Sequence, residues 1–179
     1  MMHIVLGQAR QRGVWMNFIA DSMLGRLAKW LRALGFDTIY QSRYRPSEIQ
    51  HHVAEGRIFL TRKAEHTNTY PSAIYIHSDH VGKQLAQLKA EGLLSPPPLP
   101  FTRCLRCNTL LAKADLDSVH PRVPDYVLYE NASALKYCPS CGRYYWPGTH
   151  RDRMERQLHL WGLLPLGPQS PGVAGDGEG

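Results

Sequence analysis

Short apolar runs alternate along the chain with stretches in which apolar residues recur every three or four positions. The runs predict buried parallel strands, at residues 17–20, 36–40, 57–60 and 73–76. The periodic stretches predict helices with one buried face, at residues 23–34, from Pro46 to Gly56, and in a stretch ending at Gly92. Strands that alternate with helices are typical of βαβ units. Residues 17–94 therefore predict an α/β domain with a parallel sheet.

The first predicted helix shows both a buried and a polar side. Its apolar face consists of Leu24, Leu27, Ala28, Leu31 and Leu34. Gly35 follows as the residue that ends the helix with a positive φ. Arg26, Lys29 and Arg32 are three residues apart and predict a basic stripe on the exposed side. Such a stripe can follow a phosphate backbone, so the three are candidate RNA contacts.

Acidic residues lie near the predicted strand ends. Function in parallel sheets gathers at the carboxyl edge, where Asp21, Glu48 and Asp79 fall. Asp37 is a further candidate, although it lies early in the second strand and away from that edge. Carboxylate oxygens suit Mg²⁺ or Mn²⁺. Each acid also has a structural alternative, because Asp21 and Asp79 can cap helices and Glu48 can favour a helix dipole.

The four cysteines form two C-x-x-C pairs, Cys104 with Cys107 and Cys138 with Cys141. Two such turns supply a tetrahedral shell of four sulfurs, the geometry that Zn²⁺ prefers, and they predict a zinc ribbon. Gly142 fits the second turn through a positive φ. The ion would contribute about 10 kcal/mol or more to folding. Two disulfides or a thioredoxin-like pair fit less well, since neither a secretion signal nor a strand-to-helix setting is present.

Composition and charge add limits to this picture. The chain of 179 residues is 43% hydrophobic and 20% charged, which is ordinary for a globular protein. Its net charge of +6 favours polyanionic partners. No apolar run reaches the roughly 18 residues of a membrane span, and we expect no membrane partner. Unpaired thiols beside a zinc site indicate the reducing cytoplasm.

The predicted organisation has five parts. They are an N-terminal extension at 1–16, the α/β domain at 17–94, a Pro-rich linker at 95–103, the zinc ribbon at 104–155, and a helix end with a tail at 156–179. The Gly- and Pro-rich segment from Gly162 onward is expected to be disordered.

The second half of the ribbon interleaves cations with aromatic rings. Arg143, Tyr144, Trp146 and His150 are candidate RNA contacts, because aromatic side chains stack on unpaired bases. Alternation along a strand places Tyr144 and Trp146 on one face and Tyr145 on the other. The alternative is that Tyr145 and Trp146 pack the ribbon against the first domain. His150 is interpreted as a hydrogen-bonded residue rather than a zinc ligand, since four thiolates saturate the ion.

Several linked motifs carry a family resemblance. They are Phe18 to Arg32 (FIADSMLGRLAKWLR), Leu34 to Asp37 (LGFD), Gly56 to Arg62 (GRIFLTR), and Cys138 to Arg143 (CPSCGR) running into Tyr145-Trp146 and Gly148-Thr149-His150. With these motifs, residues 17–155 resemble the Mut-seven C-terminal RNase-like domain family, which joins a PIN-like nuclease fold to a zinc ribbon. The resemblance implies a three-layer α/β domain and a ribonuclease that depends on Mg²⁺ or Mn²⁺. Asp21 matches the first acid of the family, and Glu48 stands nearest the second.

The chain departs from the family pattern at Lys63. Family members read Leu-Thr-Arg-Asp after the third strand, and this chain reads Leu60-Thr61-Arg62-Lys63. A lysine there is expected to pair with Asp21 and to compete with a metal ion. Arg62 and Lys63 join the candidate RNA contacts. Two hypotheses follow, a metal-dependent ribonuclease and an RNA-binding protein whose cleavage is weakened or lost; a protein-interaction scaffold is a third.

Overall fold

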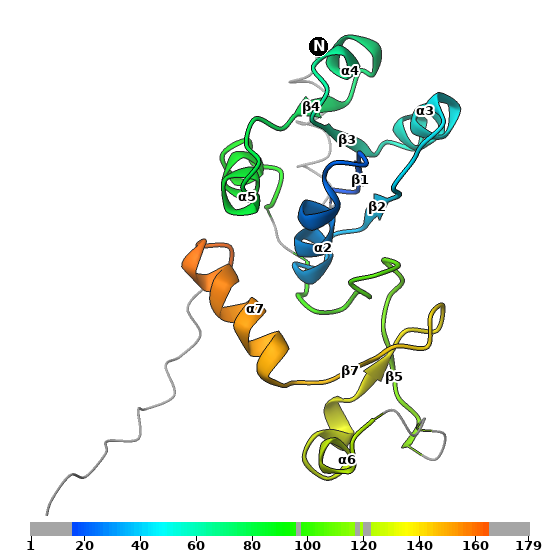
Figure 1. Cartoon of the computed structure of the whole chain (residues 1–179), viewed down its shortest axis with the longest axis vertical. Helices are drawn as coiled ribbons and strands as arrows, with labels where there is room; N and C mark the ends of the chain where they lie inside the picture. The colour runs from blue at the N-terminus through cyan, green and yellow to red at the C-terminus, as the bar shows by residue number, and fades with distance from the viewer. Residues whose placement is uncertain (1–15, 96–97, 117–118, 120–122, 165–179) are drawn as a thin grey trace, which may run out of the picture. The chain divides into compact units, whose positions relative to one another are not determined.

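A four-stranded parallel sheet forms the centre of the first part of the chain. The computed structural model describes residues 16–95, 98–116, 119 and 123–164. The strands are β1 (Phe18–Ala20), β2 (Thr38–Tyr40), β3 (Ile58–Thr61) and β4 (Ala73–Tyr75), in the order β2-β1-β3-β4 (Figure 1). All pairs are parallel, which confirms the predicted α/β class. The predicted extension at residues 1–15 lies outside the described residues.

Helices cover both faces of this sheet. They are α2 (Gly25–Ala33), α3 (Pro46–Ala54), α4 (Glu65–Thr69) and α5 (Val81–Ala90). Ile19 and Phe59 of the central strands pack against Ile49 of α3, with Tyr70, just after α4, at the border of this cluster. On the other face α2 and α5 contact one another and bury their leucines. The result is the three-layer arrangement that the family resemblance implies.

Gly35 ends α2 as expected and also permits a close chain crossing. Its φ is +92°, and Phe36 N donates to Leu31 O at 2.9 Å in the last turn. A Cβ at this position would collide with the carbonyl oxygen of Leu99, which belongs to the linker. The glycine is therefore required by conformation and by space.

A small antiparallel sheet forms the ribbon. It contains β5 (Ala112–Lys113), β6 (Lys136–Tyr137) and β7 (Tyr144–Tyr145) in that order, with α6 (Asp125–Asn131) and the 3₁₀ turn η2 (Ala132–Ala134) between β5 and β6. Buried Val127 and Leu135 contribute to its core, and Tyr144 and Trp146 pack against it. The alternation of Tyr144 and Trp146 is confirmed. Packing of Tyr145 and Trp146 against the first domain is not confirmed: Trp146 packs on the ribbon's own core, and the Tyr145 hydroxyl lies 3.1 Å from Cys104 Sγ.

The chain forms two compact units, and the second begins at Pro147. It contains α7 (Thr149–Leu160). Beyond this helix Gly162 N donates to His159 O at 2.8 Å and Leu163 N to Leu158 O at 2.9 Å. Disorder beginning at Gly162 is therefore wrong for residues 162–164, because these bonds satisfy the last helical carbonyls. Residues 165–179 lie outside the described residues. None of the described helices is both long and apolar enough to cross a bilayer.

Candidate functional site

Asp21 lies at the centre of the sheet's carboxyl edge. It directly follows β1, and its N–H continues the ladder to Leu60 O of β3 at 2.9 Å. The residue is only 4% exposed. Its Oδ2 accepts hydrogen bonds from Thr61 Oγ1 at 2.8 Å and from Arg62 N at 2.7 Å, and its Oδ1 accepts one from Met23 N at 2.8 Å. The carboxylate is thus held by three donors, and Oδ1 keeps more accepting capacity than Oδ2.

The capping alternative for Asp21 is only partly correct. The residue that precedes α2 is Leu24, and it makes no side-chain capping bond. Asp21 instead closes the turn that leads into the helix, through the bond from Met23 N. A turn alone would not require the two further donors that reach across from β3.

Lys63 does not neutralise Asp21. Its side chain is exposed, and its backbone N–H donates to Thr61 Oγ1 at 3.0 Å. Within the described part of the chain no ion pair joins Lys63 to Asp21. The expectation of such a pair is wrong, because backbone N–H groups and the threonine hydroxyl already surround the carboxylate. Lys63 still places a positive charge in this loop.

The other two acids of this edge, Asp79 and Glu48, contact other protein groups and not Asp21 itself. Asp79 is 83% exposed and forms an ion pair with Arg62, whose guanidinium also donates to Ile76 O at 3.1 Å. Glu48 Oε2 accepts a hydrogen bond from Arg45 N at 2.6 Å, just before α3. This bond stabilises the helix end, as the structural alternative for Glu48 predicted. The structure brings Asp21, Arg62 and Asp79 together through contacts, and it shows no contact between the described Glu48 and Asp21.

The residues at the carboxyl edge fit an ion that is bound by a single carboxylate, and they do not fit an ion that is bound by a cluster of carboxylates. Among the described residues, the four cysteines are the one group of three or more potential ligands close enough to share an ion. A preformed cluster of carboxylates is thus not present there. Mg²⁺ also binds through one or two carboxylates with several waters and substrate phosphates. Asp21 Oδ1 fits this mode.

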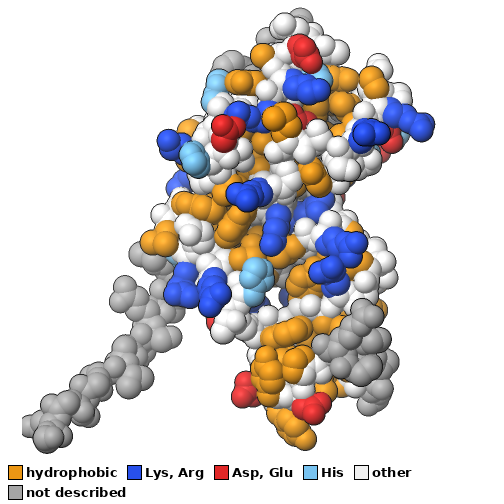
Figure 2. Space-filling view, in the orientation of Figure 1, with side chains coloured by type: hydrophobic (Ala, Val, Ile, Leu, Met, Phe, Trp, Pro, Cys, Tyr) orange, Lys and Arg blue, Asp and Glu red, His pale blue; other side chains and the backbone are white. Residues whose placement is uncertain are grey.

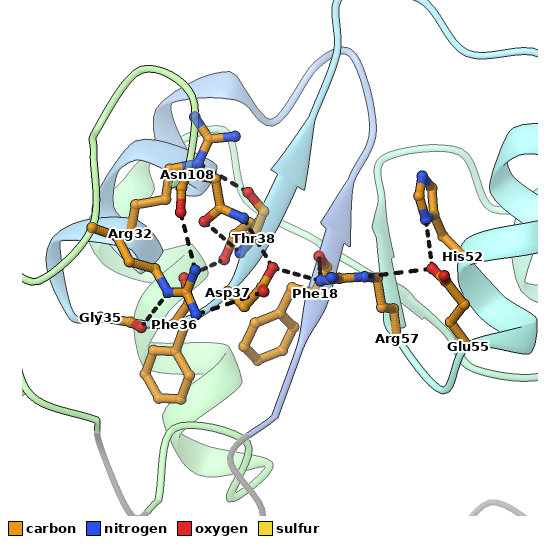
Figure 3. A network of polar contacts seen from close by, with 11 residues as sticks. Phe18, Arg32, Gly35, Phe36, Asp37, Thr38, His52, Glu55, Arg57 and Asn108 are labelled. Atoms are coloured by element: carbon orange, nitrogen blue, oxygen red, sulfur yellow. Dashed lines mark hydrogen bonds and ion pairs between the residues drawn. The ribbon is translucent and has the colours of Figure 1, made fainter. Parts of the chain in front are cut away.

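Asp37 lies at the amino-terminal ends of the parallel strands, whereas Asp21 lies at their carboxyl-terminal ends. It immediately precedes β2, and its backbone O accepts from Phe18 N at 2.8 Å at the start of β1. Its carboxylate accepts from Arg57 Nη1 at 2.6 Å and from Asn108 Nδ2 at 2.9 Å, with Arg103 Nη2 at 3.6 Å (Figure 3). The structure therefore does not bring Asp37 to Asp21, and the contacts of its carboxylate do not support the predicted catalytic role.

The same network sets the ionisation of Asp37. Burial by itself raises the pKa of this carboxyl group. The hydrogen bonds from Arg57 and Asn108, together with the charges of Arg57 and Arg103, outweigh burial and hold the pKa below its ordinary value. Asp37 is a structural anion that joins the sheet to the first cysteine turn.

Arg32 is buried, not exposed, and this corrects the predicted basic stripe. Only 4% of the residue is exposed. Its Nε donates to Thr38 O at 2.9 Å, and its Nη1 donates to Leu105 O at 3.2 Å and to Arg106 O at 2.7 Å. The two last carbonyls lie between Cys104 and Cys107. Arg32 is thus a link between α2 and the cysteine turn, and it is unavailable to RNA, while Arg26 and Lys29 are exposed as expected.

The four cysteine sulfurs converge on one point. Cys104 and Cys141 Sγ are 3.7 Å apart, Cys107 and Cys138 Sγ are 3.3 Å apart, and all four lie within 4.8 Å of one another. A tetrahedral site with Zn–S bonds of about 2.3 Å separates its sulfurs by about 3.8 Å. The four cysteines could therefore hold a zinc ion. Tyr145 lies beside them, with its hydroxyl 3.1 Å from Cys104 Sγ, a hydrogen bond that orients the ligand.

The two cysteine turns have the same backbone design. Asn108 N donates to Cys104 O at 2.9 Å, as Gly142 N does to Cys138 O at 2.8 Å. Asn108 has φ +72° and Gly142 has φ +66°, which confirms the prediction for Gly142. Asn108 uses its side chain as well, because its Oδ1 accepts from Thr38 N at 3.0 Å. Asn108 was not predicted from the sequence as a residue of the site; an asparagine in the position that corresponds to Gly142 was the available signal.

Lys and Arg side chains are interspersed with hydrophobic ones on the visible face (Figure 2). Arg143 is exposed at the second cysteine turn, whereas His150 is exposed in the first turn of α7 and belongs to the second unit. Tyr144 and Trp146 are half-buried on the ribbon core. Within the first unit, Arg143 is therefore the exposed candidate of this segment, while Tyr144 and Trp146 present only part of their rings.

Comparison with known proteins gives one informative result. No curated protein and no solved structure matches the chain significantly. The family of the Mut7-C RNAse domain matches residues 16–158, most of the chain. This range includes the sheet with Asp21 and all four cysteines. The chain therefore belongs to the Mut7-C RNAse domain family.

Proposed function

We propose that this protein is a ribonuclease that cleaves RNA phosphodiester bonds at the carboxyl edge of its sheet, beside Asp21. The observation that carries the proposal is the geometry of the Asp21 carboxylate. It is buried at the strand end and fixed by three hydrogen bonds, and it lies in the part of the chain that matches an RNase family. Strand ends of this kind are where α/β folds place their chemistry.

The contacts give each residue at the proposed site a separate role. Asp21 would hold Mg²⁺ or Mn²⁺ through Oδ1, and the ion supplies an activated water and charge stabilisation at the phosphate. The exposed cation of Lys63 attracts the RNA backbone to this loop. Arg62 joins β3 to the segment after β4 through Ile76 O and Asp79, and so supports the edge on which RNA would lie.

The ribbon has a supporting role in this proposal. A site of four thiolates leaves zinc no open position for a substrate or water. Zinc would therefore act as a structural ion in the ribbon. Exposed Arg26, Lys29 and Arg143 are the remaining candidates for contacts with RNA outside the site of cleavage.

A second function is favoured by one specific observation. By the family resemblance, Lys63 stands where a third acid is expected, and Asp79 is paired with Arg62. Reversing one charge changes its interaction with each unit charge about 4 Å away by several kcal/mol, even at an effective dielectric constant of about 20. An RNA-binding protein with weak cleavage is the function that this charge pattern favours.

A nuclease assay separates the two functions. The zinc-loaded protein is incubated with labelled single-stranded RNA and Mn²⁺ or Mg²⁺. Cleavage that disappears in Asp21→Asn, but persists in the matched control Asp125→Asn, at an exposed position in the first turn of α6, supports the ribonuclease. Cleavage equal in Asp21→Asn and in the native protein contradicts it. Little native cleavage that rises strongly in Lys63→Asp supports the weakened enzyme.

A further inference from the structure

The Thr61 hydroxyl connects Asp21 to a histidine that the proposed reaction does not use. Thr61 is fully buried, and its Oγ1 lies 2.8 Å from Asp21 Oδ2, 3.0 Å from Lys63 N and 3.0 Å from His66 Nδ1. A hydroxyl has one proton to donate and two lone pairs that accept. Three neighbours therefore use its full capacity, and each must have a defined role.

The roles follow from the chemistry of the neighbours. Asp21 accepts from two backbone N–H groups, so its carboxylate acts as an acceptor toward Thr61 as well. The Thr61 proton is thus directed to Asp21, and Lys63 N–H can only donate. His66 must then donate to the remaining lone pair, which requires the proton of the neutral imidazole to be on Nδ1.

The His66 ring is held in place by aromatic neighbours. Its centroid lies 5.3 Å from that of the buried Phe59 and 5.7 Å from that of Tyr70. The backbone around it is also fixed, since His66 N donates to Lys63 O at 3.1 Å and Tyr70 N donates to His66 O at 2.9 Å. These contacts fix the imidazole at the same end of the sheet as Asp21.

The tautomer of His66 has a consequence for Asp21. If Nδ1 were unprotonated, it would compete with Asp21 Oδ2 for the single Thr61 proton. The hydrogen bond that orients Oδ2 would then be weakened, and the position of the carboxylate would be less well fixed. With Nδ1 protonated, Oδ2 receives two hydrogen bonds, and Oδ1 is the oxygen left for a cation.

We propose that His66 is a positioning residue, which fixes the Thr61 hydroxyl through Nδ1–H and so presents Asp21 Oδ1 to a divalent cation. This inference rests on the proposed function, because it needs Asp21 to bind the ion. Partners that orient ligands in this way typically change metal affinity by about 10- to 100-fold when they are removed.

The first test reads the tautomer directly. Two-bond ¹⁵N–¹H correlation spectra of the labelled full chain, recorded well above the ordinary histidine pKa of about 6.5, are expected to show His66 protonated on Nδ1. A His66→Ala variant assigns the signal. Protonation on Nε2 would overturn the proposal, whatever the activity of the protein.

The second test measures Mn²⁺ affinity by electron paramagnetic resonance on zinc-loaded protein. His66→Ala and Thr61→Val are each expected to weaken binding about tenfold or more. His66→Asn, whose amide can donate from the Nδ1 position, retains most of the affinity. The control variant His52→Ala removes a histidine of α3 that is hydrogen-bonded to Glu55, and it leaves the Mn²⁺ affinity unchanged. His66→Gln replaces His66→Ala if the alanine variant does not fold.

The outcomes separate the inference from the proposed function. Mn²⁺ binding that Asp21→Asn removes, but His66→Ala and His66→Gln leave intact, overturns the role of His66 alone. No Mn²⁺ binding by the native protein, or binding that Asp21→Asn does not weaken, overturns the metal site and the inference with it. Loss in His66→Ala with recovery in His66→Asn supports the inference.

Discussion

At the scale of single residues, position relative to a strand decides what an aspartate does. Asp21 follows β1 and Asp37 precedes β2, so two parallel strands carry them to opposite edges. Asp21 is surrounded by backbone N–H groups and a hydroxyl, with no ion pair among the described residues. Asp37 is surrounded by cations. The first suits a cation ligand, and the second is a structural anion.

The pH dependence of Asp37 gives a prediction. Because its pKa in the folded state is below the ordinary value, its stabilising contribution is present above a pH of about 4 and is lost only as pH falls further. Asp37→Asn should lower the free energy of unfolding by about 1–3 kcal/mol. Urea titrations should give the same difference at pH 7 and near pH 5. A difference that shrinks over this range contradicts the predicted ionisation.

Asn108 offers a test that separates backbone from side chain. Asn108→Gly keeps the positive φ and should retain zinc binding, but it removes the bonds to Thr38 N and Asp37. We expect a loss of about 1–3 kcal/mol in unfolding free energy. Asn108→Ala should cost about 1–2 kcal/mol more, because it adds strain. Equal stabilities for the two variants would show that the conformation at this position is unimportant.

At the scale of elements, the three cations of α2 have two different environments: Arg26 and Lys29 are exposed, and Arg32 is buried. Residues three apart on a helix drift by about 60° per step, so Arg32 lies about 120° around the helix from Arg26 and nearer the buried side. This drift explains why a regular spacing predicted a stripe that the structure does not contain. Arg26 and Lys29 remain exposed, and Arg32 donates to three carbonyls.

Alanine variants of α2 should therefore behave in opposite ways. Arg32→Ala leaves buried carbonyls without donors and should destabilise the protein by several kcal/mol, as measured by urea unfolding. Lys29→Ala should change stability by less than about 0.5 kcal/mol. If Lys29 contacts RNA, its variant reduces the slope of log affinity against log salt by about 0.7. A stable Arg32→Ala protein would contradict the link to the cysteine turn.

At the scale of the whole molecule, local patterns predicted the elements but not the contacts between them. The apolar runs located the four strands, and the cysteine spacing located the metal site. The network of Asp37, Arg57, Arg103 and Asn108 joins residues up to 71 positions apart. The spacing of apolar residues within one helix or strand carries no information about contacts between residues so far apart in the sequence. The short α4 was missed because its polar sequence, EHTNT, has no apolar face.

Zinc removal tests how the first unit is held together. The first cysteine turn provides the carbonyls of Leu105 and Arg106 to Arg32, and it presents Asn108 to β2. Chelation should therefore increase hydrogen exchange in the ribbon and at Thr38, whose N–H bonds to Asn108. Amides in the middle of β3 should stay protected. Unchanged exchange at Thr38 would contradict this coupling.

The most direct test of the central claim, that RNA is cut beside Asp21, is anomalous diffraction from crystals grown with Mn²⁺ and a short RNA. We predict an anomalous Mn²⁺ peak in contact with Asp21 Oδ1 and with a phosphate oxygen of the RNA. RNA bound away from this edge, with no Mn²⁺ peak beside Asp21, would contradict the claim.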